Sequence, residues 1–384
     1  MGKKLNAVVA INALNLDGYR PTGIGHHTLQ LAFWFGKINA ERGMAHRVLV
    51  ICRHDASVHL ANVTGIEVRT VNAGNSRFTR VLYEQLLLPF LMWHLNVGVV
   101  INPAFTGPVW GARTVVTVVQ DLYFKVVPEL LNKAQLRYLS AFVPFCCRRS
   151  QIVLTTSVST MSDLVNFYPE LKHKIRVVPL ASRMDVSVPP LEAGRVGENP
   201  YVLMVAALTG NKNPGPLVAA ISILRQSFPK LKLVHVGKDP FDLLKNAITK
   251  HDADDWVQCS QDISDHELKS LYSDCLCVAI PSLYEGFGLP LLEAQALGAA
   301  VVSSNRGSLP EVGGDGAIYV DPTNVEQIVD AISTLINQPL TRYNLREAGY
   351  NNQALYSWEK TARSTWSIML ETDKLSPRVP LRMR

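Results

Sequence analysis

Two glutamates and one lysine stand out as side chains that could act together on a ligand. The segment PSLYEGFGLPLLE at residues 281–293 places Glu285 and Glu293 on either side of a Gly-Phe-Gly turn. Lys212 lies in a second glycine-containing segment, TGNKNPGP. A carboxylate accepts hydrogen bonds from hydroxyl groups, and a cation at a helix start can neutralise phosphate. These residue types would therefore suit a ligand that carries both sugar hydroxyls and a diphosphate.

The elements around the two glutamates place them at the end of a buried strand. Residues 275–280, CLCVAI, form an apolar run that predicts a buried parallel strand. Residues 289–298 have apolar side chains at helical spacing. Glu285 then lies at the carboxyl end of the strand and Glu293 in the early turns of the next helix. In open α/β sheets the crevice at this end of the strands binds ligands.

Lys212 is expected in an equivalent position after another strand. Residues 201–208, YVLMVAAL, predict that strand, and Asn213 and Pro214 suit the N-cap and the first position of the helix that follows. Spacing alone also allows a simpler interpretation, in which Lys212 is a solvated surface lysine and both glutamates are exposed acids that complement a helix dipole.

The longer segment at residues 281–322, PSLYEGFGLPLLEAQALGAAVVSSNRGSLPEVGGDGAIYVDP, resembles the donor-site segment of glycosyltransferase family 4. The similarity continues more weakly to YSWEKTA at residues 356–362. The resemblance implies the GT-B fold, a retaining reaction and a nucleotide diphosphate sugar as donor. It also points to the enzymes of bacterial polysaccharide and O-antigen synthesis.

The resemblance implies a role for each candidate residue. Glu285 would bind hydroxyls of the donor sugar, Glu293 the ribose, and Lys212 the diphosphate, with Glu285 and Lys212 as the catalytic pair. Further donor contacts would come from the loop Gly286, Phe287, Gly288 and Leu289. Many relatives carry an arginine at or near Ala207 or Asn211, and this sequence has none there. Diphosphate binding would then depend on Lys212 and backbone amides.

Two more candidate sites lie in the first half of the chain. Gly23 and Gly25 form a G-x-G between a predicted strand and a helix, which is a weak dinucleotide signal without the third glycine and the ribose acid. The resemblance places them in a flexible loop near the donor phosphates. Gln120 and Asp121 end a predicted strand where many similar enzymes have His-Asp. An amide cannot titrate near neutral pH, so Gln120 is no general base. We expect Gln120 and Asp121 to contact the acceptor, and Asp121 could equally be a strand-end cap.

Strand-like runs alternate with helix-length amphipathic segments, as is typical of βαβ units around parallel sheets. The runs lie at 6–11, 46–52, 97–101, 113–121, 151–156 and 174–179, and again at 201–208, 231–237, 255–259, 275–281, 299–304 and 317–320. We expect two Rossmann-like domains facing across a cleft. Their predicted bounds are 1–180 for the acceptor domain, 181–199 for a linker and 200–357 for the donor domain. Residues 358–384 are expected to form a C-terminal helix that packs back on the first domain, followed by a basic tail.

Composition and charge indicate a folded chain with a basic first half. The 384 residues are 47% hydrophobic, and no uncharged apolar run is long enough to span a membrane. Residues 1–180 carry 19 Lys and Arg against 9 Asp and Glu. This excess, with apolar segments near 81–95 and 138–150, suits peripheral contact with an anionic membrane or a lipid-linked acceptor, and a solvated basic surface is an equal alternative. We expect a cytoplasmic protein on the inner face of the membrane and no nucleic-acid partner.

The sequence predicts neither a metal site nor a cofactor. The six cysteines lack C-x-x-C spacing and the ten histidines lack H-x-x-x-H spacing. The leading expectation is a retaining hexosyltransferase, possibly for mannose, that acts on a glycan acceptor in cell-surface polysaccharide synthesis. One alternative is a GT-B protein without turnover that serves as a binding or assembly partner. A Rossmann oxidoreductase is the other, and the incomplete G-x-G argues against it.

Overall fold

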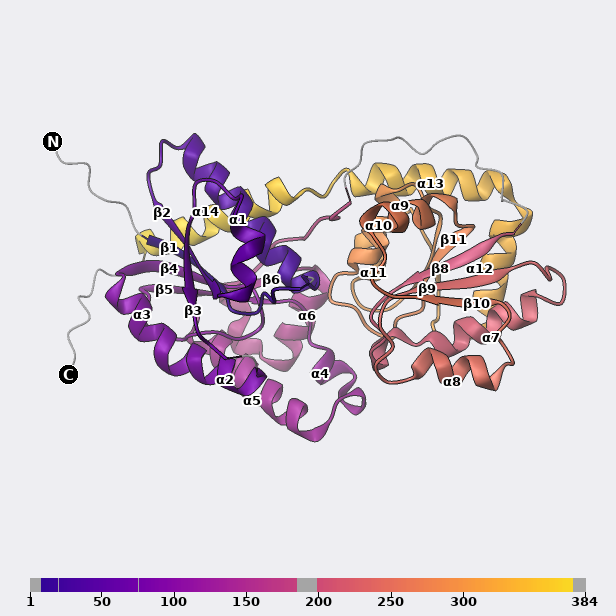
Figure 1. The fold of residues 1–384 in the computed structure, drawn as a ribbon, viewed down its shortest axis with the longest axis horizontal. Coiled ribbons are helices and arrows are strands. Elements are labelled where there is room, and N and C mark those ends of the chain that lie inside the picture. The colour runs from indigo at the N-terminus through magenta and orange to yellow at the C-terminus, as the bar shows by residue number, and fades with distance from the viewer. Residues whose placement is uncertain (1–7, 20, 75, 185–198, 376–384) are drawn as a thin grey trace. The chain divides into compact units, whose positions relative to one another are not determined.

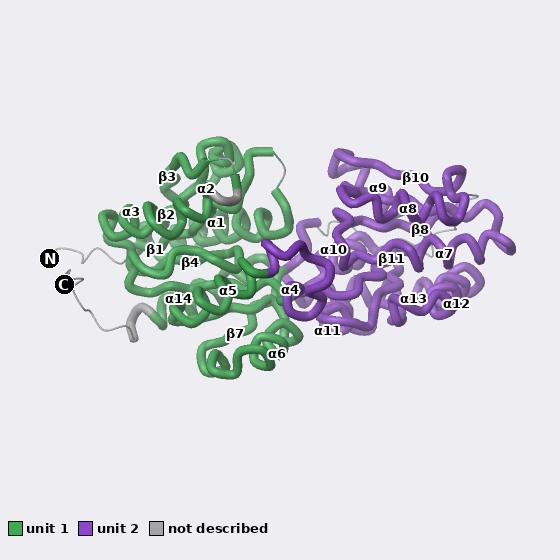
Figure 2. Tube along the Cα trace, turned by 90° about the horizontal axis from the view of Figure 1, so that it is seen from below, with its two compact units in different colours: residues 1–122, 137–180, 358–384 green, residues 123–136, 181–357 purple. Residues whose placement is uncertain are grey.

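The computed structural model describes residues 8–19, 21–74, 76–184 and 199–375. The chain forms two compact units, which Figure 2 shows in separate colours. The first comprises residues 1–122, 137–180 and 358–384, and the second residues 123–136 and 181–357. Each unit is built on one parallel sheet, which agrees with the predicted α/β class.

Seven parallel strands form the sheet of the first unit in the order β3-β2-β1-β4-β5-β6-β7 (Figure 1). They are β1 (Val8–Ala13), β2 (Arg47–Arg53), β3 (Glu67–Val71), β4 (Val97–Asn102), β5 (Thr114–Val119), β6 (Ile152–Thr155) and β7 (Ile175–Val177). Strands β4 and β5 are buried along their whole length, as expected for central strands covered on both faces. The order of strands along the chain reverses between β1 and β4.

Helices cover both faces of this sheet. They are α1 (Gly23–Glu41), α2 (Arg77–Leu82), α3 (Leu88–His94), α5 (Lys133–Arg149), α6 (Val158–Phe167) and α14 (Trp358–Leu375), with a π turn at Tyr83–Leu87 and 3₁₀ turns at Asp55–Leu60 and Pro169–Lys174. Ile11 of β1 packs in one core with Phe35 of α1 and Trp366 of α14, whose rings meet edge to face. Ala10, which points to the opposite side, packs in a second core with Leu88 of α3.

Six parallel strands form the sheet of the second unit in the order β10-β9-β8-β11-β12-β13. They are β8 (Tyr201–Val205), β9 (Lys232–Val236), β10 (Val257–Ser260), β11 (Cys277–Ile280), β12 (Val301–Ser304) and β13 (Ile318–Val320). The helices are α4 (Tyr123–Val126), α7 (Pro214–Leu224), α8 (Leu243–Lys250), α9 (Asp265–Asp274), α10 (Leu289–Ala296), α11 (Leu309–Gly313), α12 (Val325–Asn337) and α13 (Pro339–Gln353), with 3₁₀ turns at Pro128–Leu130 and Gly210–Lys212. Here the strand order reverses between β8 and β11.

Each predicted strand run overlaps one of these strands, but the sequence analysis missed β3. This edge strand has the sequence EVRTV, and its side chains are exposed or only half-buried. Glu67 of β3 accepts two hydrogen bonds from Arg47 of β2, at 2.6 and 2.5 Å. An edge strand that faces solvent has no apolar run to reveal it.

The division into units departs from the predicted domain bounds at residues 123–136 and at the start of the predicted linker. Residues 123–136, which fall inside the predicted first domain of 1–180, group with the second unit. A β-carbon on Gly210 of that unit would lie 3.0 Å from the side chain of Leu130, so the two segments pack tightly. The second unit also includes residues 181–184, the start of the predicted linker. Residues 185–198 of the linker and 376–384 of the basic tail lie outside the described residues.

Candidate active site

The three leading site residues of the sequence analysis lie in the second unit, where its strand order reverses. Strands β8 and β11 are parallel neighbours at the centre of the sheet. The loop after β8 carries Lys212, and the loop after β11 carries Glu285. Because the next strands run outward in opposite directions from this pair, the two loops separate and leave the crevice in which open α/β sheets bind ligands.

Lys212 and Glu285 form an ion pair. Lys212 Nζ lies 2.5 Å from Glu285 Oε1, and the same oxygen accepts a hydrogen bond of 2.8 Å from Ser282 Oγ. The two charged side chains are only 18% and 13% exposed. Together with Ser282 and Pro290, they line a small cavity at the ends of the strands. The pair holds a cation and a carboxylate in place for a ligand that carries phosphate and hydroxyl groups.

Backbone contacts between loops fix the position of this pair. Asn211 accepts at its carbonyl a 2.7 Å hydrogen bond from the Leu283 amide, and its side-chain amide donates to the Tyr284 carbonyl at 3.0 Å. The hydroxyl of Ser308 donates to the Glu285 carbonyl at 3.0 Å. Asn213 precedes α7 as predicted, but its φ is 50° and its side chain donates to the Pro322 carbonyl instead of capping the helix.

The glycine loop brings backbone close to other loops at the start of α10. Gly288 has a φ of +91°, and a β-carbon there would lie 2.6 Å from Leu309 Cδ2. Gly286 is buried as well. Phe287 points into the protein, where its ring packs edge to face on Tyr356 at 5.9 Å. Any ligand contact of Phe287 therefore comes from its backbone. Leu289 is the first residue of α10, whose N-terminus favours negative charge.

Glu293 is buried inside the second unit, away from solvent. Its Oε1 accepts a 2.7 Å hydrogen bond from Arg183 Nε, and its Oε2 accepts one of 3.1 Å from the Tyr272 hydroxyl. Burial raises the pKa of Glu293, while the positive charge of Arg183 and these hydrogen bonds oppose that rise. Sequence reasoning missed Arg183, because no spacing pattern links it to a glutamate 110 positions away.

The glycines of the first unit lie in a helix, which corrects the predicted flexible loop. Helix α1 begins at Gly23, and the Thr22 side chain caps it by accepting a hydrogen bond from the Gly25 amide. A β-carbon on Gly25 would lie 3.2 Å from Leu16 and Pro21, so the glycine allows close packing of the preceding loop. Thr22 is the signal that places this helix start, and it outweighs the usual association of glycine with loops.

Gln120 contacts residues within the first unit. Its side-chain amide donates to the Pro103 carbonyl at 2.9 Å and lies 3.0 Å from His27 Nδ1. Burial lowers the pKa of His27 to about 3, so the ring is neutral and Nδ1 can accept this hydrogen bond. Gln120 thus ties the end of β5 to α1 and β4. Asp121 follows it and is half-buried.

The charged and polar groups described above do not amount to a metal-binding cluster. Within the described residues, no group of three or more His, Cys, Asp or Glu side chains lies close enough together to hold a metal ion. The six cysteines are free thiols, and Cys259 is exposed.

The fold, with its two parallel sheets covered by helices, is of the GT-B class. One solved structure of similar fold is WaaG, a glycosyltransferase involved in lipopolysaccharide biosynthesis. It aligns with a TM-score of 0.71 and 16% sequence identity over 94% of this chain and 99% of that one. This likeness confirms the predicted fold.

The sequence comparisons match part of the chain to known glycosyltransferases. Residues 192–352 match the model of the glycosyl transferases of group 1. The O-antigen chain mannosyltransferase B of Escherichia coli is 29% identical over 65% of this chain and 68% of its own length. The MMP alpha-(1->4)-mannosyltransferase of Mycolicibacterium hassiacum is 31% identical over 56% of this chain and 53% of its own length. The chain is thus similar to the glycosyl transferases of group 1 over residues 192–352, which make up less than half of its length.

Proposed function

We propose that the protein transfers a hexose, with mannose as the first candidate, from a nucleoside diphosphate sugar to a hydroxyl group of a glycan, with retention of the anomeric configuration. The names of the two mannosyltransferase relatives support the choice of sugar, and the O-antigen relative supports a lipid-linked surface polysaccharide as acceptor. The retaining course rests on the resemblance of residues 281–322 to the donor-site segment of family 4.

The chemistry follows from the residues at β8/β11. The acceptor oxygen would bond to C1 of the donor sugar on the face from which the diphosphate departs, and the acceptor proton would pass to the departing phosphate oxygen. The Lys212 ammonium would stabilise the negative charge that develops on the leaving diphosphate. Glu285 would accept hydrogen bonds from donor sugar hydroxyls, and the N-terminus of α10 would face the phosphates. Lys212 supplies the charge, so no protein-bound metal or cofactor is needed.

The observation that carries this proposal is the Lys212–Glu285 pair at the carboxyl ends of β8 and β11. A cation and a carboxylate 2.5 Å apart are held together by three loops. The same pair could also hold a ligand in an inactive binding protein, the alternative from the sequence analysis, and it is the mannosyltransferase names of the relatives that favour an enzyme.

A donor screen tests the proposed reaction. The wild-type protein is incubated with GDP-, UDP- and dTDP-hexoses, and release of the nucleoside diphosphate is followed with and without glycan acceptors. Release from one donor, its loss in Lys212→Met, and a product of unchanged anomeric configuration by NMR would support the proposal. Absence of release from every donor, with or without acceptor, would favour the binding protein, and an inverted product would contradict retention.

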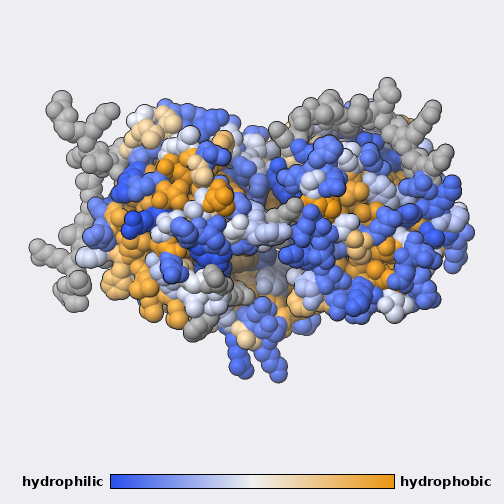
Figure 3. Space-filling view, viewed as in Figure 1, coloured by the Kyte–Doolittle hydropathy of each residue, from blue (hydrophilic) through white to orange (hydrophobic). Residues whose placement is uncertain are grey.

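We further propose that the first unit contacts an anionic membrane surface through α3 and the π turn Tyr83–Leu87 before it. Leu86, Leu87, Phe90 and Trp93 are each 43% exposed or more, and Phe90 packs edge to face on the half-exposed Trp110. Hydrophobic surface gathers around α3 at the left of Figure 3. The excess of Lys and Arg in residues 1–180 would add attraction to anionic lipid headgroups. No helix in the described part of the chain is long and apolar enough to cross a membrane.

Co-sedimentation with vesicles tests this contact. Binding to vesicles that contain phosphatidylglycerol should fall steeply with added salt, because such attraction is screened within about 8 to 10 Å. The double variant Phe90→Ser with Trp93→Ser should bind more weakly, whereas Phe241→Ser, a control at an exposed phenylalanine of the second unit, should not. Equal binding of all three proteins, or none at low salt, would contradict the contact.

A further inference from the structure

The first unit has a second reversal of strand order, and a cavity lies there. Strands β1 and β4 are parallel neighbours at this point, with β2 and β3 on one side and β5 to β7 on the other. A cavity of about 230 Å³ lies beside the segments that follow the two strands. Its lining residues are Asn15, Thr22, Ile24, Arg80, Ala104, Phe105, Thr106, Tyr138 and Leu139. In an open α/β sheet, this is the position where a ligand binds.

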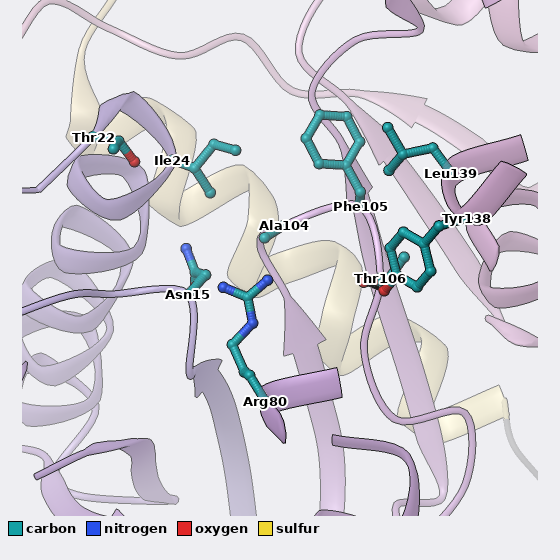
Figure 4. A pocket seen from close by; sticks show the side chains of 9 residues that line it. All are labelled: Asn15, Thr22, Ile24, Arg80, Ala104, Phe105, Thr106, Tyr138 and Leu139. Atoms are coloured by element: carbon teal, nitrogen blue, oxygen red, sulfur yellow. Dashed lines mark hydrogen bonds between the residues drawn. The ribbon is translucent and has the colours of Figure 1, made fainter. Parts of the chain in front are cut away.

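Two polar atoms of this cavity are buried without a partner. Among the described residues, Arg80 Nε and Asn15 Oδ1 make no hydrogen bond. The Asn15 amide nitrogen is engaged, because it donates to Thr28 Oγ1 at 3.2 Å. Figure 4 shows the Arg80 guanidinium reaching toward Asn15 and Ala104. A buried polar group without a partner costs free energy, and a ligand that supplies the missing hydrogen bonds would recover it.

The opposite wall of the cavity is aromatic and includes a strained residue. The rings of Phe105 and Tyr138 lie across from Arg80 (Figure 4). Phe105 has a φ of +53°, which is unusual for a bulky side chain. Strained residues of this kind cluster at ligand-binding and active sites, although six other non-glycine residues of the described chain also have a positive φ. Beside it, a β-carbon on Gly107 would lie 2.2 Å from the Asn102 side chain, so the loop packs directly on the end of β4.

The charge of Arg80 is only partly balanced nearby. Glu84 follows it by one helical turn and is buried, with its Oε1 accepting a hydrogen bond of 3.4 Å from Asn12. Burial raises the pKa of Glu84 to about 7, although Arg80 and Asn12 oppose that rise. Arg80 is the one charged residue among the described residues that line the cavity, so the lining is positively charged.

We propose that this cavity binds an anionic sugar unit, one that bears a phosphate or a carboxylate, with Arg80 holding the anion and Asn15 a hydroxyl. The guanidinium forms paired hydrogen bonds with carboxylate and phosphate groups, and aromatic rings suit the apolar faces of sugars. The volume lies just below the range of about 300 to 1,000 Å³ for drug-sized ligands, so it fits a single sugar ring. The proposal extends the proposed function, because such a unit would belong to the acceptor.

Titration calorimetry with simple probes tests the cavity independently of turnover. The probes are mannose 6-phosphate, glucuronate and methyl mannoside, at constant ionic strength. The proteins are wild type, Arg80→Met, Arg80→Lys and Lys212→Met, with Arg42→Met as a control at an exposed arginine of the same unit. Circular dichroism and thermal unfolding verify that each variant is folded, and Arg80→Lys keeps the charge should Arg80→Met fail to fold.

The proposal predicts that at least one anionic probe binds saturably to wild type. Methyl mannoside should bind at least roughly tenfold more weakly, because a tenfold change in affinity is the scale of one charged hydrogen bond. Arg80→Met should weaken binding of the anionic probe by a similar factor, and Arg80→Lys should weaken it by less. Lys212→Met and Arg42→Met should leave its affinity unchanged. Which anionic probe binds more tightly distinguishes phosphate from carboxylate.

Three outcomes would overturn the proposal. They are equal affinity for the neutral sugar, loss of binding in Lys212→Met but not in Arg80→Met, and no saturable binding of either anion. Binding through Arg80 in a protein without transferase activity would leave this inference standing while contradicting the proposed function.

Discussion

Both sheets of the protein reverse their strand order at the centre, at β8/β11 and at β1/β4. The two positions differ in whether their polar side chains have hydrogen-bonding or ionic partners. At β8/β11, Lys212 and Glu285 neutralise each other at 2.5 Å. At β1/β4, Arg80 Nε and Asn15 Oδ1 are buried without partners among the described residues. A ligand at the first place must replace an existing ion pair, whereas a ligand at the second fills open hydrogen-bonding positions. The same topology can therefore supply one site with a paired lysine and glutamate and another with an unpaired arginine Nε and aromatic walls.

The largest expected effect is on turnover at the paired site. Lys212→Met should slow transfer by about a hundredfold or more, since it removes the charge that stabilises the leaving diphosphate. Glu285→Gln should slow turnover by a similar factor. Because the two side chains contact each other, the double variant should lose less than the product of the single losses. Steady-state kinetics of the four proteins measure this coupling, and strictly multiplicative losses would show that the two residues act independently.

The next effect concerns the buried carboxylate of Glu293. Glu293→Gln should weaken donor affinity by roughly 1 to 3 kcal/mol if this carboxylate binds ribose. Arg183→Met is the matched control, because it breaks the same ion pair without removing the carboxylate. It should destabilise the fold but weaken donor binding less. If both variants lose stability equally and neither changes the Kd of the donor, the pair is purely structural and the ribose assignment is wrong.

A third effect is the pH dependence that Glu84 gives to stability. Its pKa is raised to about 7 in the folded protein, so between its usual value of 4.5 and 7 the folded state keeps a proton that the unfolded state loses. Stability should therefore fall as pH rises through this window and then level off. Glu84→Gln should remove this dependence and be more stable than wild type at pH 8, by on the order of 3 kcal/mol.

Urea unfolding at pH 4.5, 6 and 8 measures the contribution of Glu84. The control is Glu326→Gln, which changes an exposed glutamate of the second unit and should track wild type at each pH. Parallel pH profiles for wild type and Glu84→Gln would show that Glu84 is ionised in the folded protein. In that case the Glu84 carboxylate neutralises Arg80. The sites at β1/β4 and β8/β11 would then differ less in how their charges are balanced.

The smallest expected effect is that of a chelator. Since Lys212 is proposed to supply the charge that stabilises the leaving diphosphate, turnover in EDTA should match turnover in buffer alone. Restoration of a lost activity by magnesium would show instead that a cation accompanies the donor, and Lys212 would then share its role.

The sequence predicted the site at β8/β11 far better than the one at β1/β4, for a physical reason. Glu285, Glu293 and the glycine loop occur within one stretch of thirteen residues, so their spacing is visible in the sequence. Strands buried on both faces are equally visible as apolar runs, which is why only the exposed edge strand β3 escaped. The cavity near Arg80, in contrast, combines residues of several distant elements, and no local pattern joins them.

The remaining errors come from local geometry that tertiary contacts decide. The resemblance placed Gly23 and Gly25 in a flexible loop, but Thr22 caps a helix that includes both. Arg183 lies at the edge of a segment rich in Pro, Gly and charge, where the sequence suggested only a linker. Its pairing with Glu293 follows from the burial of that carboxylate, which requires a partner and which only the folded structure reveals.

Donor binding to three proteins tests the separation of roles between the two places most directly. Titration calorimetry with GDP-mannose, and with UDP- and dTDP-hexoses, compares wild type with Lys212→Met and Arg80→Met. We predict that one donor binds wild type. Lys212→Met should raise the Kd of this donor by roughly tenfold or more, and Arg80→Met should leave that Kd within about twofold of the wild-type value. Unchanged donor affinity in Lys212→Met, or its loss in Arg80→Met, would contradict the assignment of the donor to β8/β11.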